Sequence, residues 1–204
     1  PRKATTTTTT TTSPIPIEKQ IRCLVLSSGE EIEIASRTVR IAKDWEITVW
    51  EQHEPARVVE EYTYGGKNYE NTNNENLSLD PFGLVLWPGS IVAAQELQRR
   101  QLQNSTVLVL GAGTGMEAQA VAQLGAKKVI ATDIHPTTLD LLQYGAKEAG
   151  LESIVSARVL DVFAEKELPP CDILVVADVL YNPELAMQVG KRCLEALQRE
   201  HPPK

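Results

Sequence analysis

The sequence predicts an α/β fold: a Rossmann-like sheet of parallel strands with flanking helices, preceded by a small antiparallel β module. Short apolar runs alternate with helix-like segments over the second half of the chain, which is typical of β-α units. A glycine-rich turn directly follows the first of these runs. The first part of the chain instead alternates polar and apolar residues with a period of two, which indicates antiparallel strands.

The 204 residues divide into three parts. Residues 1–16 contain eight consecutive threonines, Thr5–Thr12, and we expect this low-complexity polar segment to be disordered. Its basic start, Arg2-Lys3, leaves an organelle transit peptide open, although a linker explains it as well. Residues 17–79 form the predicted β module, and residues 80–204 form the predicted Rossmann-like domain.

Charge and composition exclude several classes of protein. The formal net charge of −7 argues against a general binder of nucleic acids or anionic membranes, but it suits a Lys/Arg-rich protein partner. The three cysteines, Cys23, Cys171 and Cys193, lack metal-binding or disulfide spacing and indicate reduced thiols in an intracellular, cytoplasmic setting. The three histidines are equally dispersed, so we expect no metal site. No apolar run approaches the ~18 residues that a transmembrane helix requires.

The predicted β module shows alternating apolar residues over 21–52, broken at Ser27-Ser28-Gly29 and at Lys43-Asp44. This pattern predicts three or four short antiparallel strands. We expect Trp45 and Trp50 to fill a small core of this module. An acidic stretch follows and is more typical of a solvated face than of a substrate-docking surface; its members are Glu46, Glu51, Glu54, Glu60 and Glu61.

The segment from Asp80 to Leu97 joins the two predicted parts. A strand-like run, Leu84–Trp87, precedes Pro88-Gly89, and Ser90 is a suitable N-cap for a helix from Ile91 to about Gln101. Trp87, beside this helix start, either walls a ligand pocket or packs in the core.

The best-defined unit of the sequence begins with a predicted buried strand, Thr106–Leu110, followed by glycines at 111, 113 and 115. A predicted helix (116–124) and a second apolar run ending in Asp133 complete a β-loop-α-β unit. In open α/β sheets such an acid accepts hydrogen bonds from ribose hydroxyls. Because Met116 stands where a dinucleotide fingerprint has its third glycine, the spacing favours a ribose-bearing ligand without pyrophosphate, such as S-adenosylmethionine.

Two further β-α units follow. Residues 137–149 are predicted to form a helix, 156–160 a strand ending at Asp161, 173–177 a strand ending at Asp178, and 184–199 the last helix. The glycine turn and all three acids therefore follow the carboxyl ends of predicted parallel strands. Those ends share one edge of the sheet, where ligands bind in this class of fold.

Four motifs together resemble the family 16 seven-β-strand methyltransferases, best known for protein lysine methylation. They are L-W-P-G-S-I-V-A-A (86–94), V-L-V-L-G-A-G-T-G (107–115), A-T-D-I-H-P (131–136) and A-D-V-L-Y (177–181). The resemblance implies an S-adenosylmethionine-dependent transfer of a methyl group to a protein nitrogen, most simply that of lysine. Members that methylate histidine or small molecules leave the acceptor open.

The resemblance also implies roles for individual residues. Asp178 and Tyr181 would orient the acceptor, and Trp87 would wall the cofactor pocket. Asp133 would hold the ribose. The remaining cofactor-binding positions would be Gly111, Ala112, Gly113, Thr114 and Gly115 around the methionine part, and Ile134, Asp161, Val162 and Ala177 near the adenine and the transfer channel.

The chain departs from the family pattern at Val109 and Val162, where the family usually carries an acid and an aromatic residue. Three strands of the seven-stranded sheet are also missing after the last helix, so the chain reads as a fragment, with residues 173–177 as an apolar edge open to self-association. These departures keep a second hypothesis open, a methyltransferase-like scaffold without turnover. A third hypothesis, a nucleotide-dependent oxidoreductase, is opposed by Met116 and by the D-x-x-Y motif.

Overall fold

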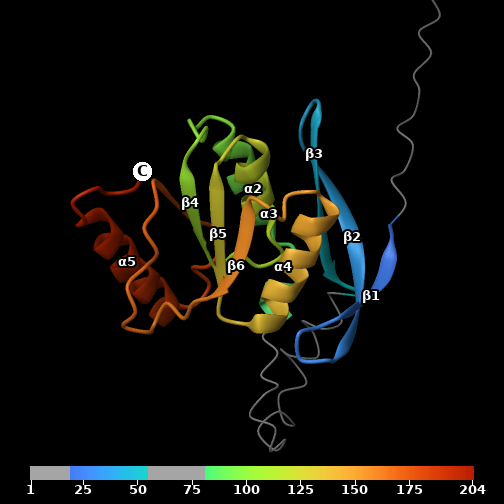
Figure 1. Cartoon of the computed structure of the whole chain (residues 1–204). Coiled ribbons are helices and arrows are strands. Elements are labelled where there is room, and N and C mark those ends of the chain that lie inside the picture. Colours follow the sequence, from blue (N-terminus) through green and yellow to red (C-terminus); the bar gives the residue numbers. More distant parts are fainter. Residues whose placement is uncertain (1–18, 55–80) are drawn as a thin grey trace, which may run out of the picture.

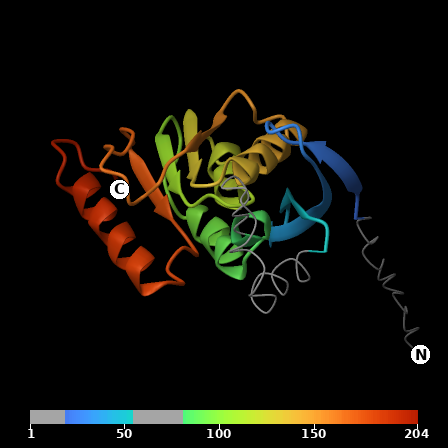
Figure 2. The ribbon, with the colours of Figure 1, turned by 90° about the horizontal axis from the view of Figure 1, so that it is seen from below.

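The computed structural model describes residues 19–54 and 81–204, which form four layers (Figure 1). An antiparallel sheet lies on one side, three helices pack between it and a parallel sheet, and a last helix covers the far face of the parallel sheet (Figures 1 and 2). The predicted α/β class with a preceding antiparallel module is therefore confirmed. The expected disordered segment 1–16 and the acidic residues Glu60 and Glu61 lie outside the described residues.

The parallel sheet has the strand order β6-β5-β4-β7. Its strands are β4 (Thr106–Leu110), β5 (Lys128–Asp133), β6 (Val155–Val159) and β7 (Ile173–Val176). The chain adds β5 and β6 on one side of β4 and then crosses to add β7 on the other side, pairing Val107 with Ile173. This reversal places a topological switch point at the carboxyl end of β4, where open α/β sheets bind their ligands.

Alternating side chains of β4 serve two separate cores. Val107 and Val109 point to the face covered by α2 (Pro88–Leu97), α3 (Met116–Gln123) and α4 (Pro136–Glu148), where they join the largest buried cluster. Leu108 and Leu110 point to the other face, where Ala196 of α5 (Pro183–Leu197) joins their cluster. A strand that is apolar on both faces is therefore buried on both faces, as its composition predicts.

The antiparallel sheet consists of β1 (Ile21–Val25), β2 (Glu31–Ala42) and β3 (Trp45–Gln52), with an irregularity in the pairing between Arg40 and Ala42. Contrary to the expectation of a small separate core, the apolar residues of this sheet pack against other elements. Trp50 packs with Leu84 and with Leu141 of α4, and its ring meets that of Tyr144 edge-on at 5.1 Å. Trp45 donates to Gln123 of α3 at 2.6 Å. The module therefore supports the helices that carry the site.

The predicted strand over 84–87 is wrong. A short 3-10 turn, η2 (Pro81–Leu84), occupies its start, and the chain then runs irregularly into α2. Trp87 is the N-cap and Pro88 the first helical residue, so the predicted cap Ser90 lies inside the first turn. Proline is favoured at that first position because its missing N–H has no helical partner there.

Strand β7 is an edge of the parallel sheet, as expected, but this edge is not fully open. Lys204 accepts a hydrogen bond from the Leu174 backbone N–H at 3.1 Å and donates its own N–H to the Asp172 carbonyl at 2.9 Å. Across the described ranges, no helix combines the length and apolarity needed to cross a bilayer.

Candidate active site

A cavity of about 430 Å³ opens at the carboxyl ends of β4, β5, β6 and β7. Its volume lies in the usual range for small-molecule sites. It is lined by almost every residue that the sequence places in the site: Trp87, Gly111, Gly113, Thr114, Asp133, Ile134, Asp161, Val162, Ala177, Asp178 and Tyr181. The two that do not line it, Ala112 and Gly115, belong to the turn behind it. The switch point of the sheet thus brings together four loops that are far apart in sequence.

The turn after β4 requires its glycines. Gly111, Gly113 and Gly115 have φ angles of 64°, 49° and 86°, in the left-handed region that a Cβ disfavours. A Cβ on Gly111 would overlap the Val179 side chain, and one on Gly115 would lie 2.8 Å from Leu142 of α4. The turn is therefore packed closely against Val179 and Leu142, and a side chain at Gly111 or Gly115 would not fit there.

Asp133 ties this turn to the end of β5. One carboxylate oxygen accepts from the Gly113 N–H at 3.1 Å, and the other accepts from the His135 N–H at 3.3 Å. The residue is only 9% exposed, and burial raises the pKa of its carboxyl above the usual value, while these backbone hydrogen bonds oppose the rise. Asp133 is a fixed hydrogen-bond acceptor at the cavity wall, with Ile134 beside it.

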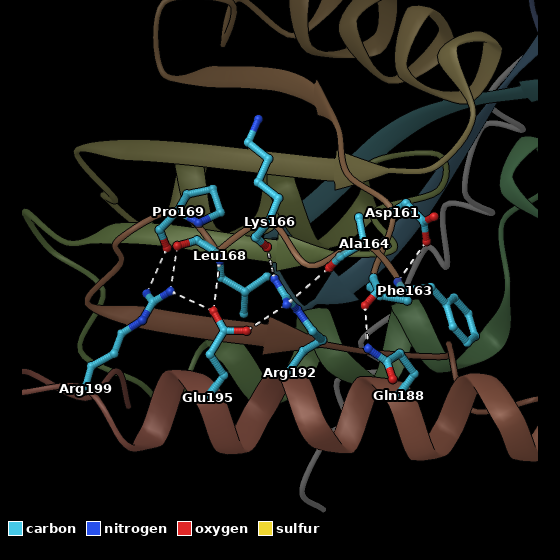
Figure 3. A network of polar contacts seen from close by, with 11 residues as sticks. Asp161, Phe163, Ala164, Lys166, Leu168, Pro169, Gln188, Arg192, Glu195 and Arg199 are labelled. Atoms are coloured by element: carbon cyan, nitrogen blue, oxygen red, sulfur yellow. Dashed lines mark hydrogen bonds and ion pairs between the residues drawn. The ribbon is translucent and has the colours of Figure 1, made fainter.

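Asp161 and Val162, in the loop that follows β6, form another wall of the cavity, and hydrogen bonds fix both residues. Asp161 accepts from the Phe163 N–H at 2.8 Å, and the side-chain amide of Gln188 on α5 donates to the Val162 carbonyl at 2.9 Å (Figure 3). Phe163, which also lines the cavity, extends this wall. Because the hydrogen bond is made by the Val162 carbonyl, it does not require the aromatic side chain that the resembling family usually carries at this position.

Polar side chains of α5, together with Arg199 just after its end, hold the rest of this loop (Figure 3). Arg192 donates to the carbonyls of Ala164 and Lys166, and Arg199 donates to those of Leu168 and Pro169 at 2.6 and 3.1 Å. Glu195 pairs with both arginines and accepts from the Leu168 N–H at 3.0 Å. These contacts replace hydrogen bonds that an irregular loop cannot make with itself.

Asp178 lies on the opposite side of the cavity, after β7. Its φ angle is 54°, unusual for a residue other than glycine, although Asp tolerates the left-handed region better than most. Its carboxylate accepts from the Gly89 N–H at 2.8 Å, in the first turn of α2. This turn carries the positive end of the helix dipole, which favours a negative charge there.

Aromatic rings gather beside Asp178. The ring of Phe82 lies 5.8 Å from that of Trp87 and 5.6 Å from that of Tyr181, and the Trp87 N–H donates to the Phe82 carbonyl at 2.8 Å. Tyr181 is 62% exposed, so its ring is accessible at the mouth of the cavity. An acid beside accessible ring faces forms a site that attracts cations.

Sequence reasoning missed several residues of the cavity. Phe82 lies in the 3-10 turn before the run 84–87 and was given no role, and Ser90 was interpreted only as a cap. Phe163 follows Val162 and Val179 follows Asp178, both of which sequence reasoning did identify, so inspection of the flanking residues would have found them. Within residues 19–54 and 81–204, no group of three or more His, Cys, Asp or Glu side chains is arranged to hold a metal ion.

Comparison with known proteins gives the family. The sequence model of the ribosomal protein L11 methyltransferases (PrmA) matches residues 6–195. The ribosomal protein L11 methyltransferase of Alteromonas mediterranea is 28% identical over 152 residues, 72% of this chain and 50% of that protein. A mouse histone-arginine methyltransferase is 30% identical over 109 residues, 50% of this chain and 43% of that protein. The chain spans about half the length of the curated relatives it matches.

Among solved structures, a putative RNA methyltransferase from Pyrococcus horikoshii aligns with a TM-score of 0.45 and 20% identity over 52% of each chain. The family match confirms the expectation of an S-adenosylmethionine-dependent methyltransferase family and of S-adenosylmethionine as its cofactor. None of these matches supports the narrower family 16 assignment, since the matching model is that of the L11 methyltransferases.

Proposed function

We propose that this chain, which belongs to the ribosomal protein L11 methyltransferase (PrmA) family, contains the S-adenosylmethionine site and the transfer site of a protein N-methyltransferase. The observation that carries the proposal is the single cavity that joins the glycine turn and Asp133 to Asp178 and Tyr181. One side of this cavity offers backbone amides and a buried acid to a nucleoside, and the other offers an acid and aromatic rings to a cationic side chain.

The cavity fits the cofactor in size and in chemistry. Gly111 and Gly113 would let the methionine part approach the backbone, because no Cβ intervenes. Asp133 would accept hydrogen bonds from the ribose hydroxyls, as acids at this position of open α/β sheets do. Ile134 and the residues 161–163 would flank the adenine, and Trp87 would close the cavity from the side of α2.

The chemistry asks the protein mainly for alignment. The sulfonium of S-adenosylmethionine supplies an already activated methyl group, so the chain has to hold the acceptor nitrogen in line with it and keep water away. Asp178 would accept a hydrogen bond from the acceptor and fix its direction. An ionised acid opposes loss of the amine proton, so we assign Asp178 to orientation and not to proton removal.

We propose lysine as the acceptor. The rings of Phe82, Trp87 and Tyr181 beside Asp178 favour a cationic side chain. Among cationic side chains, an amine with a pKa near 10.4 loses its proton far more readily on burial than a guanidinium, whose pKa exceeds 12. The mouse relative, a histone-arginine methyltransferase, makes arginine the competing acceptor.

The protein partner that we propose is basic, since the chain carries a net charge of −7. The names of the L11 methyltransferase relatives make ribosomal protein L11 the first substrate to test. A cytoplasmic location belongs to the same proposal. Self-association through the β7 edge stays a prediction. Measuring the molecular size of the intact chain and of a variant shortened after residue 200 would test it.

The experiment is transfer of a labelled methyl group from S-adenosylmethionine to recombinant bacterial L11, with lysine-acetylated L11 as the matched control. We expect label in L11, loss of label on acetylation, and at least a hundredfold slower transfer by Asp178→Asn with S-adenosylhomocysteine binding retained. Label that survives acetylation would contradict lysine. Binding of S-adenosylhomocysteine without transfer to L11 or to a protein extract would favour the scaffold hypothesis.

A further inference from the structure

A buried carboxyl lies directly behind the cavity and has no role in the site described so far. Glu117 is the second residue of α3, just after the glycine turn, and is only 2% exposed. Its Oε1 atom is buried without a hydrogen-bond partner among the described residues. Because buried polar atoms are nearly always paired, an unpaired carboxyl oxygen beside a binding site calls for an explanation.

The first turn of α2 connects this carboxyl to the cavity. Ser90 lines the cavity, and its side chain is hydrogen-bonded to that of Glu117. The neighbouring Gly89 N–H holds the carboxylate of Asp178, which also lines the cavity. Two acids therefore meet the same helical turn, one from behind the cavity and one from its mouth.

The surroundings of Glu117 bring the pKa of its carboxyl close to neutral pH. Burial is the largest effect and raises the pKa of Glu117 from 4.5 to about 7. The hydrogen bonds from Ser90 and from the Glu117 backbone N–H lower this pKa, and the charge of Asp178 raises it. Both protonation states are therefore populated at neutral pH, and a change of charge nearby shifts the balance between them.

Among the described residues, the other elements packed against α3 bring no competing charge to this carboxyl. On α4, Asp140 is bound by Ser27, Glu148 is bound by Arg22, and Lys147 is exposed. Strand β4 carries no ionisable side chain. The buried acids of β5 and β3, Asp133 and Glu51, are held by other groups: Asp133 by Gly113 and His135, and Glu51 by the Leu86 N–H and Arg37. The remaining ionisable residues of α2, β3, β5 and β6 are exposed; they are Glu96, Glu46, Lys128 and Arg158.

We propose that Glu117 makes the cavity distinguish a cationic occupant from a neutral one, and therefore S-adenosylmethionine from its product. A positive charge near Ser90 and Asp178 stabilises the ionised form of Glu117, whereas the neutral thioether of S-adenosylhomocysteine does not shift the balance between the two protonation states. Ionised Glu117 in turn strengthens the binding of the sulfonium. This inference rests on the proposed function, since it assumes that the cavity binds this cofactor.

The consequence is a pH-dependent preference. Below about pH 5 Glu117 is protonated with either ligand and does not discriminate between them. As pH rises through 7, it ionises first in the complex with S-adenosylmethionine, so the affinity for S-adenosylmethionine rises relative to that for S-adenosylhomocysteine. A difference of one unit between the pKa values of Glu117 in the two complexes changes the affinity ratio about tenfold between the acidic and alkaline limits.

The test is calorimetric titration of the full chain with each of the two nucleosides from pH 5.5 to 8.5. For the wild type we expect the affinity ratio to rise about tenfold with pH, and we expect proton release on binding S-adenosylmethionine at pH 7, detected by comparing two buffers. Glu117→Gln should show, at every pH, the affinity ratio that the wild type has at acidic pH, and it should release fewer protons on binding S-adenosylmethionine. The matched control, Asp140→Asn, removes an acid of α4 that binds Ser27 and does not line the cavity, and it should behave as the wild type.

A second variant keeps the test decisive if Glu117→Gln fails to fold. Ser90→Ala removes a hydrogen bond that lowers the pKa of Glu117, so the rise in the ratio should move to higher pH. A wild-type ratio that does not change with pH, or a Glu117→Gln ratio that changes as much as that of the wild type, overturns the proposal. Absence of binding by both nucleosides in a folded protein overturns the proposed function, and this inference with it.

Discussion

The two sides of the cavity are built differently, although each is organised around an acid at the end of a strand. On the β4–β5 side, which comprises the glycine turn and Asp133, the acid is buried and fixed by two backbone amides. On the β7 side, which comprises residues 177–181, Asp178 is exposed and accepts a hydrogen bond from the Gly89 N–H, and Tyr181 is open to solvent.

This difference matches two kinds of ligand. A small nucleoside that always binds in the same way benefits from a rigid, enclosed set of hydrogen bonds, because little ordering remains for the binding step. A side chain presented by a large protein needs an accessible mouth. We therefore expect substitutions on the β4–β5 side to affect nucleoside affinity and those on the β7 side to affect transfer.

The largest effect should come from Asp133→Ala. The change removes a charged acceptor for the ribose and the anchor of Gly113, and hydrogen bonds to charged groups contribute roughly 1.5–3 kcal/mol each. We expect S-adenosylhomocysteine affinity to fall by about a thousandfold in calorimetry, with the fold retained by circular dichroism. An affinity within tenfold of the wild type would break the proposed division of the cavity.

The second effect concerns Glu117, which lies behind both sides. Its pKa in the folded protein, about 7, exceeds the ordinary 4.5, so the native state binds more protons between these values and loses stability as pH rises through them. This loss amounts to about 3 kcal/mol in the free energy of unfolding, and Glu117→Gln should remove it. Denaturant unfolding of both proteins at pH 5 and pH 8 measures the difference, and equal pH dependence in both would contradict it.

A smaller effect should follow Gly89→Ala. A Cβ there would lie 2.5 Å from a carboxylate oxygen of Asp178, so the acid must shift away from its position. We expect transfer to L11 to slow about tenfold, about 1.4 kcal/mol in the barrier, with S-adenosylhomocysteine affinity changed less than twofold. Gly190→Ala is the matched control, since this glycine of α5 has open space around it. Similar losses in both variants would point to a general helix effect.

The smallest effect should come from Tyr181→Ala. A cation–π contact at an exposed ring contributes about 1 kcal/mol, so we expect about a fivefold rise in the KM for L11 with little change in kcat. Tyr181→Phe keeps the ring and should resemble the wild type. A Phe variant as weak as the Ala variant would assign the effect to the hydroxyl and would remove the argument for a cationic acceptor.

Sequence reasoning was most successful where the signal is local. Strand β4 was predicted residue for residue, and β5, β6 and β7 within about one residue, because a buried parallel strand is a short apolar run between turn signals. Most of the predicted site residues line one cavity because parallel strands must bring their carboxyl ends to the same edge.

The failures came from contacts between distant segments. The start of α2 was placed too late because Ser90 is a good N-cap, whereas Pro88 already fits the first helical position. The core of the antiparallel module depends on Leu84 and Leu141, which its own residues cannot reveal. Likewise, nothing in the sequence around Glu117 indicates that Ser90 and Asp178 lie beside it.

The side-chain hydrogen bonds to the backbone of the loop after β6 have a consequence for how this part of the protein can evolve. Arg192, Arg199 and Gln188 bind main-chain oxygens, so they recognise the path of the loop and not its side chains. Mutations across residues 164–169 that keep this path leave every one of those contacts intact. Substitutions at the two arginines should instead be tolerated poorly. Among relatives, we therefore expect the exposed positions of the loop to vary, whereas Leu168, which packs in the core, and the side chains that bind the loop backbone should change little.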